Sequence, residues 1–206
     1  MNQALTQYIE RNIIPLYDGF DKAHQRDHAL QVIERSLRLA AHYDVDDDMV
    51  YAIAAYHDVG LCEGRETHHA VSKRIVLNDS NLRQWFSVEQ IMIMADAVED
   101  HRASSGQEPR SIYGKIVAEA DRLIDPVKVM TRTVQYGLDH YPELDKEGQY
   151  QRFKQHLIEK YSDTGYMKLW LPESDNHSRL EELRSVIRDE KQLREQFDRI
   201  YETCRR

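Results

Sequence analysis

A histidine and an aspartate stand side by side at positions 57 and 58, directly after the apolar run of residues 52–55. This run predicts a helix that is buried on several faces, and Gly60 predicts its end. Polar ligand groups at the end of a buried helix are costly unless something pairs with them, so the pair indicates a divalent cation. The alternative is a structural pair, with His57 on the helix dipole and Asp58 in the following turn.

Further candidate ligands lie on both sides of this pair, at intervals of about one helix. His28 lies on an amphipathic segment upstream, and Asp121 lies in the last turns of a predicted helix downstream. His24 and His28 are four residues apart and therefore share one helix face, a spacing that metal sites use. A carboxylate in an apolar setting near a helix C-terminus, as predicted for Asp121, is poorly favoured unless a cation relieves it.

The order His28, His57 with Asp58, and Asp121 resembles the HD superfamily of metal-dependent phosphohydrolases, and residues 57–60 (HDVG) are similar to its HDIG form. The resemblance covers roughly residues 18–136. It implies that these four residues bind a metal ion, with His57 and Asp58 at the catalytic centre. It also favours His28 over His24, which becomes a neighbour that contacts substrate or an exposed histidine.

Two more histidines match the branches of this family that hold a second metal ion. His68 is followed four residues later by the small residue Ser72, and His101 closes the predicted helix of residues 87–101. The resemblance ranks His68 above His69 as a ligand, although both also fit ordinary first-turn helix positions. The implied metal ligands are His28, His57, Asp58, His68, His101 and Asp121.

This mixed set of nitrogen and oxygen donors suits a divalent transition metal or magnesium (Mn, Fe, Co, Ni, Zn or Mg). We expect one ion, with room for a second one that shares Asp58 as a bridging carboxylate. Candidate contacts to the substrate carry positive charge or lie beside the first ligand, although each also fits a plain surface residue. They are His24, Lys73, Arg102 and Arg122.

The resemblance implies a phosphohydrolase that uses water activated by the metal on a small phosphorylated substrate. A nucleotide is the favoured substrate, cleaved at a phosphomonoester or pyrophosphate bond. The Gly-Tyr-Pro signature of cyclic-dinucleotide phosphodiesterases is missing, and Arg102 replaces the threonine of the dinucleoside-tetraphosphate branch. The alternative is a non-catalytic HD-fold protein that regulates by binding metal and nucleotide.

Composition sets further limits. The chain has 206 residues, of which 31% are charged and 41% hydrophobic, and its formal net charge is -8. This charge argues against binding of long nucleic acid, which needs clustered Lys and Arg. With neither a leader pattern nor a long apolar run, we expect a cytoplasmic protein that is not bound to a membrane. Cys62 and Cys204 are expected to be free thiols.

We expect an all-α fold, a compact bundle of eight to eleven helices that forms one HD-type domain over residues 1–206. Its core spans about residues 18–141, and residues 142–206 form a helical extension of the same unit. In this extension we expect one helix within 142–161, a shorter one within 163–171, and a long amphipathic helix from residue 178. The last helix either packs back on the domain or pairs with a second copy in a homodimer.

Overall fold

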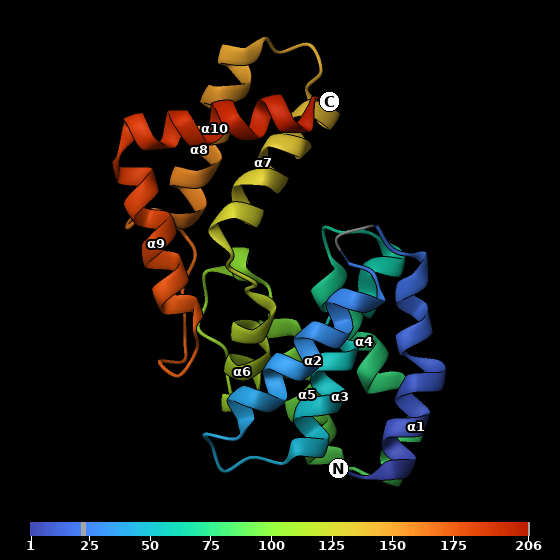
Figure 1. Cartoon of the computed structure of the whole chain (residues 1–206). Coiled ribbons are helices and arrows are strands. Elements are labelled where there is room, and N and C mark those ends of the chain that lie inside the picture. The colour runs from blue at the N-terminus through green and yellow to red at the C-terminus, as the bar shows by residue number, and fades with distance from the viewer. Residues whose placement is uncertain (22–23, 206) are drawn as a thin grey trace. The chain divides into compact units, whose positions relative to one another are not determined.

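The computed structural model describes residues 1–21 and 24–205, and in this part of the chain the secondary structure is entirely helical (Figure 1). Ten α-helices and four short 3-10 helices lie within the described residues. The expected all-α fold is therefore confirmed. The chain forms two compact units, one of Met1–Arg122 with Trp170–Ser174, and one of Leu123–Leu169 with Asp175–Arg206.

The first unit contains six of the described α-helices. They are α1 (Gln3–Asn12), α2 (Arg26–Ala40), α3 (Asp47–Tyr56), α4 (His68–Asn78), α5 (Val88–Asp100) and α6 (Ile112–Asp121). Short 3-10 helices connect several of them: η1 (Ile14–Gly19), η2 (Val59–Glu63), η3 (Ser80–Gln84) and η4 (Ala103–Ser105). The core of this unit includes α1, because Leu5 and Ile9 are fully buried, so it begins before the expected boundary at residue 18.

Helix α3 is the central element of the first unit and packs against α1, α2, α5 and α6. Every residue from Met49 to Tyr56 is buried, as expected for a helix that is apolar all round. Asp46 caps its N-terminus by accepting hydrogen bonds from the backbone N–H groups of Asp48 (2.9 Å) and Met49 (3.4 Å). Because neighbours surround α3, its C-terminal end lies inside the unit.

A short segment from the second half of the chain, residues 170–174, is part of the first unit. The backbone N–H of Trp170 donates to Glu119 Oε2 (2.7 Å), and Leu171 is buried in the core. The hydroxyl of Tyr43 donates to Glu173. The prediction of a short helix within residues 163–171 is wrong, because these residues form turns, bends and chain without regular secondary structure.

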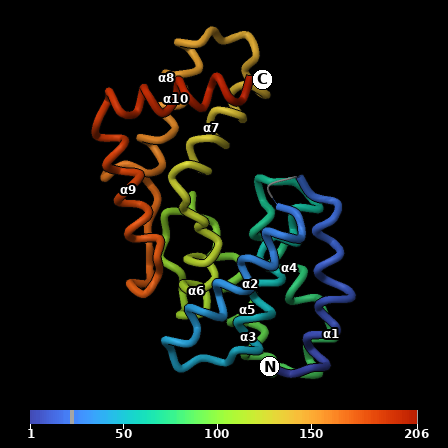
Figure 2. Tube along the Cα trace, in the orientation of Figure 1, coloured from blue at the N-terminus to red at the C-terminus, as the bar shows by residue number. Residues whose placement is uncertain are grey.

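The second unit contains α7 (Pro126–His140), α8 (Lys146–Tyr161), α9 (Asn176–Arg188) and α10 (Glu190–Cys204), traced in Figure 2. The expected single long helix from residue 178 is wrong, because it is interrupted at Asp189. This residue has an extended backbone, and its carboxylate accepts from the N–H of Gln192 (3.0 Å), which caps α10. Phe153 and Phe197 are fully buried between these helices.

The single domain expected over residues 1–206 stays a prediction, because the division into two compact units does not show whether the units unfold together.

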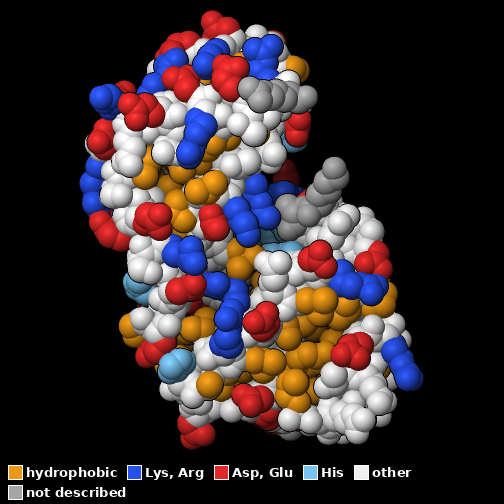
Figure 3. Space-filling model, in the orientation of Figure 1, with side chains coloured by type: hydrophobic (Ala, Val, Ile, Leu, Met, Phe, Trp, Pro, Cys, Tyr) orange, Lys and Arg blue, Asp and Glu red, His pale blue; other side chains and the backbone are white. Residues whose placement is uncertain are grey.

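In the space-filling view, Lys and Arg side chains stand among Asp and Glu side chains over the visible face (Figure 3). Among the described residues, no helix combines the length and the apolar character that crossing a bilayer requires.

Asp79, which follows α4, connects three elements of the first unit. Its Oδ2 atom accepts hydrogen bonds from the hydroxyls of Tyr8 on α1 (2.6 Å) and Tyr56 on α3 (2.5 Å). Burial raises the pKa of Asp79, but the hydrogen bonds from Tyr56, Tyr8 and Asn81 outweigh burial and lower this pKa. The charged carboxylate is therefore the form that stabilises the fold.

We expect Asp79→Asn to lower the free energy of unfolding by about 2 kcal/mol at pH 7, the size of hydrogen bonds to a charged group. The folded-state pKa lies below the unfolded value of about 4, so this contribution is lost as the pH falls below that value. Urea denaturation of wild type and variant between pH 7 and 3 measures both effects. A difference that stays constant with pH would contradict this role, and Tyr56→Phe should show a smaller loss with the same trend.

Candidate metal centre

His57 and Asp58 lie where α3 ends and η2 begins. The backbone of His57 is still helical (φ -54°, ψ -39°), whereas that of Asp58 has left the helix (φ -112°, ψ 4°). This change turns two adjacent side chains toward one place, with His57 Nε2 3.2 Å from Asp58 Oδ2. Both residues are buried, at 0% and 4% exposure. The structure thus shows the convergence at a helix end that sharing a cation requires.

A first group of ligand atoms surrounds Oδ2 of Asp58. His28 Nε2, from the first turn of α2, lies 3.6 Å from this oxygen and 3.3 Å from His57 Nε2. Oδ1 of Asp121, the last residue of α6, lies 3.2 Å from His28 Nε2 and 3.9 Å from His57 Nε2. His28, His57 and Asp58 form a cluster that could hold a metal ion, and Asp121 adjoins it through His28.

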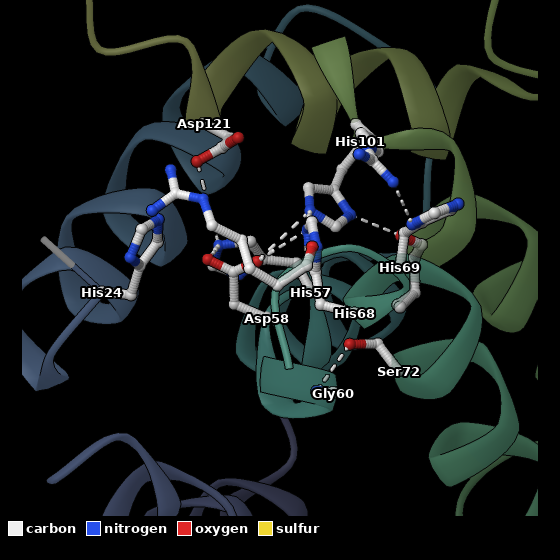
Figure 4. A network of polar contacts seen from close by, with 12 residues as sticks. His24, His57, Asp58, Gly60, His68, His69, Ser72, His101 and Asp121 are labelled. Atoms are coloured by element: carbon white, nitrogen blue, oxygen red, sulfur yellow. Dashed lines mark hydrogen bonds and ion pairs between the residues drawn. The ribbon is translucent and has the colours of Figure 1, made fainter. Parts of the chain in front are cut away.

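A second group faces the other oxygen of the same carboxylate. His68 Nε2, from the first residue of α4, lies 3.4 Å from Asp58 Oδ1, and His101 Nε2 lies 3.3 Å from it. The two imidazole nitrogens are 3.1 Å apart. Figure 4 shows Asp58 with His68 and His101 on one side and Asp121 on the other. The carboxylate of Asp58 therefore stands between two separate groups of histidine nitrogens.

Three of these imidazoles are oriented in the same way by the end of a helix or a turn. In His57, His68 and His101, Nδ1 lies 2.6–2.8 Å from the backbone carbonyl oxygen three residues earlier. A carbonyl can only accept, so Nδ1 must donate its proton in each contact. In the neutral ring, Nε2 then carries the lone pair, and it is the Nε2 atoms that face Asp58. This arrangement prepares the three rings as ligands.

Electrostatics at Asp58 favour the charged carboxylate. Burial raises the pKa of Asp58, but attraction by His57 and hydrogen bonds from His101, His28 and His57 hold this pKa well below its usual range. Burial likewise lowers the pKa of His28, yet the hydrogen bonds to Asp121 and Asp58 prevail and raise it to about 10. Without a cation, protons on the histidines therefore compensate the two carboxylates.

His68 and His101 have pKa values displaced in opposite directions. Burial, and then repulsion by His101, lowers the pKa of His68 to about 4. Burial also lowers the pKa of His101, but its hydrogen bond to Asp58 outweighs burial and raises it. Two lone pairs 3.1 Å apart would repel each other, so the geometry needs a proton or a cation between the two Nε2 atoms.

The donor atoms of both groups fit a divalent metal ion. Imidazole nitrogens and carboxylate oxygens are ligands that manganese, iron, cobalt, nickel and zinc accept, and Asp58 offers one oxygen to each group. Five of the six ligands that the resemblance implied form these two groups, and Asp121 lies at the edge of the first group beside His28. Their individual roles as ligands stay predictions.

Tyr17, on η1, is a residue of this site that sequence reasoning missed. It is fully buried, its hydroxyl donates to the carbonyl oxygen of Ala55 (2.9 Å), and it accepts from the N–H of Asp58 (3.3 Å). The same hydroxyl lies 3.5 Å from His57 Nδ1. Tyr17 thus fixes the end of α3. No sequence pattern pointed to it, because forty positions separate it from His57.

Gly60 brings α4 close to the turn that follows the His–Asp pair. Its N–H donates to Ser72 Oγ (2.8 Å), and a Cβ atom at position 60 would lie 2.1 Å from the carbonyl oxygen of His68. Only glycine permits this approach of two backbones. The small residue Ser72 accepts this hydrogen bond, and the close contact places His68 beside Asp58.

Two of the other candidate residues, His24 and Lys73, make different contacts. The ring of His24 packs edge-on against His28, with centroids 5.7 Å apart. Lys73 forms ion pairs with Asp96 and Glu99, both at 2.8 Å. Their roles in substrate binding stay predictions.

Arg122 and Arg102 are the two remaining candidates, and they occupy different surroundings. Arg122 is 6% exposed and lies over the ring of Trp170. Arg102 follows His101 in the chain and contacts His69, which lies outside both ligand groups. A role in substrate binding stays a prediction for both arginines.

We expect Tyr17→Phe to lower the free energy of unfolding by about 1–3 kcal/mol, because a buried carbonyl and a buried N–H lose a partner. The variant should also bind metal more weakly, because the end of α3 is less firmly held. Thermal unfolding and calorimetric titration with Mn²⁺ measure the two effects. Tyr43→Phe, which removes a hydroxyl from an exposed contact to Glu173, is the matched control. Wild-type metal affinity in Tyr17→Phe would contradict the positioning role.

We expect Gly60→Ala to push α4 and His68 away from Asp58, because the new methyl group meets backbone atoms that cannot move alone. If the wild type holds two ions per chain, Gly60→Ala should hold closer to one, and its melting temperature should be lower. Mass spectrometry of metal content measures this. Gly19→Ala is the control, because no atom lies within 4 Å of a Cβ there. Equal metal content in wild type and Gly60→Ala would refute this function of the glycine.

Comparison with known proteins adds one match. The model of the HD domain family matches residues 26–124, which include all six implied metal ligands. No curated protein sequence and no solved structure matches the chain. An HD domain implies metal-dependent activity of the hydrolase type, which agrees with a group of histidines and aspartates able to hold a metal ion. Residues 26–124 therefore form an HD domain.

Proposed function

We propose that the protein is a metal-dependent phosphohydrolase that cleaves a phosphomonoester or pyrophosphate bond in a small phosphorylated substrate, with nucleotides as the favoured class. The observation that carries the proposal is the position of Asp58. Its two oxygens face two groups of histidine nitrogens, His28 with His57 and His68 with His101. A carboxylate shared in this way could bridge the two ions of a two-metal hydrolytic site.

The residues of the site have separable tasks in this reaction. Asp58 and the four histidines would hold a divalent cation, which as a Lewis acid would activate water and neutralise charge on the phosphoryl group. The backbone carbonyls behind His57, His68 and His101 keep each Nε2 aimed at the centre. Burial of His57, Asp58 and His101 keeps bulk water away and strengthens the electrostatic interactions of these groups.

The ligand groups and the charge of Asp58 suit metal-dependent hydrolysis. Each group brings together three residues that could hold a metal ion, and the low pKa of Asp58 keeps its carboxylate charged at neutral pH. A regulator that binds metal and nucleotide would use the same imidazoles, so only turnover separates it from a hydrolase. The non-catalytic reading is therefore the outcome to be excluded by measurement.

The decisive experiment compares variants of the two groups. Asp58→Ala should lose metal at both groups and all phosphate release, and His101→Ala should lose metal only at the second group. Metal content by mass spectrometry is measured beside phosphate release from a nucleotide panel with added Mn²⁺, Mg²⁺, Co²⁺ or Ni²⁺. His42→Ala, at an exposed histidine, controls for adventitious binding among the ten histidines.

We expect at least a thousandfold loss of phosphate release in Asp58→Ala, in line with the several kcal/mol that metal-ion catalysis contributes. Wild-type metal content in Asp58→Ala would refute the metal centre. A wild type that holds metal and binds nucleotide but releases neither phosphate nor pyrophosphate would favour the regulatory alternative.

A further inference from the structure

The two ends of the metal centre differ in charge. On the side of His28, the ring of His24 is paired with the carboxylate of Asp21, with Nδ1 2.8 Å from Oδ1. On the side of His68, the adjacent ring of His69 is paired with Arg102. Figure 4 shows His24 and His69 at opposite ends of the cluster. One end is thus compensated by an acid, and the other carries a guanidinium group.

Arg102 is held firmly without an acidic partner. Its Nε donates to Ser104 Oγ (2.9 Å), and its Nη1 donates to the carbonyl oxygen of Glu66 and to His69 Nδ1 (3.2 Å). Among the described residues, no carboxylate lies within ion-pair distance of this guanidinium, and Nη2 has no hydrogen-bond partner. The guanidinium of Arg102 is therefore a preorganised positive charge with unused hydrogen-bond donors, in a chain whose net charge is -8.

His69 contributes a second donor at the same place. An arginine can only donate, so the contact with Arg102 makes His69 Nδ1 the acceptor and leaves the proton of the neutral ring on Nε2. This N–H has no partner among the described residues. Glu99 acts on His69 electrostatically, but its carboxylate is engaged by Lys73 (2.8 Å) and Arg110 (2.6 Å).

We propose that Arg102 and His69 form an anion-binding subsite beside the metal centre, which selects substrates with a second anionic group next to the phosphoryl group that is attacked. This inference rests on the proposed phosphohydrolase function. The ring centroid of His69 lies 5.6 Å from that of His68, and Arg102 contacts the ring of His69. An anion bound to Arg102 would therefore lie next to the second group of ligands. A second phosphoryl group and a carboxyl group both offer the paired oxygens that a guanidinium binds.

The test measures anion binding to protein loaded with Mn²⁺ and does not require turnover. Calorimetric titrations use phosphate, methylenediphosphonate, whose P–C–P link resists hydrolysis, and phosphonoacetate, in which a carboxylate replaces the second phosphonate. We expect the wild type to bind one of the two-anion probes at least tenfold more tightly than phosphate, the gain from one charge-assisted hydrogen bond. The preferred probe identifies the second anion. Metal content is measured after each titration, because these probes also bind free metal.

Arg102→Gln should abolish the preference while phosphate still binds. Arg83→Gln, at an exposed arginine of η3, makes the same change in net charge and should leave the preference unchanged. Arg102→Lys keeps the charge but lacks the planar fork, so its preference should fall between those of wild type and Arg102→Gln. It also serves as the second variant if Arg102→Gln does not fold.

Three outcomes would overturn the subsite: equal affinity of wild type for one-anion and two-anion probes, an unchanged preference in Arg102→Gln, or an equal loss in Arg83→Gln. These are distinct from failure of the proposed function. In that case the protein loaded with metal would bind none of the probes and release no phosphate from any nucleotide.

Discussion

The structure of the first unit depends on one buried carboxylate. Asp58 is 4% exposed and has four histidine nitrogens within 3.6 Å of its two oxygens. A buried charge is stable only where opposite charge and hydrogen-bond donors surround it. The helices of this unit supply those groups from four directions, because no single element could place them around one residue. The packing of the helices thus also builds the metal centre, because it places the histidines around Asp58.

Helix ends provide these groups, and there is a geometric reason for this. His57 and His101 follow the last residues of α3 and α5, Asp121 is the last residue of α6, and His68 is the first of α4. Within a helix, adjacent side chains point about 100° apart, so they cannot share a ligand. At an end the backbone departs from the helix, and free carbonyls remain to orient an imidazole through Nδ1. Side chains at such positions can converge while the helices themselves stay apolar and buried.

The close approach of elements around the centre is as specific as the ligands. Gly60 lets α4 contact the turn after Asp58, and Tyr17 holds the end of α3 from η1. Neither residue belongs to a ligand group. Both act by fixing where a ligand stands, which decides whether two histidines meet one carboxylate oxygen at about 3.3 Å or miss it. A hydrolytic site of this kind therefore needs its supporting residues as much as its ligands.

The sequence alone determined the helical class and the order of histidines and aspartates that identifies an HD domain. These follow from local chemistry, because periodicity and a short motif are properties of neighbouring positions. The break at Asp189 was missed because, within an amphipathic segment, a capping aspartate cannot be told from an ordinary polar residue on the exposed face of a helix.

Only the tertiary structure decided that the two oxygens of Asp58 face different histidine groups, that Tyr17 supports the turn, and that residues 170–174 pack on the first unit. The same holds for the guanidinium of Arg102, whose neighbours Glu66 and His69 lie more than thirty positions away. Such contacts join residues distant in the chain, and their geometry depends on how the apolar helix faces pack together. No local pattern contains that information.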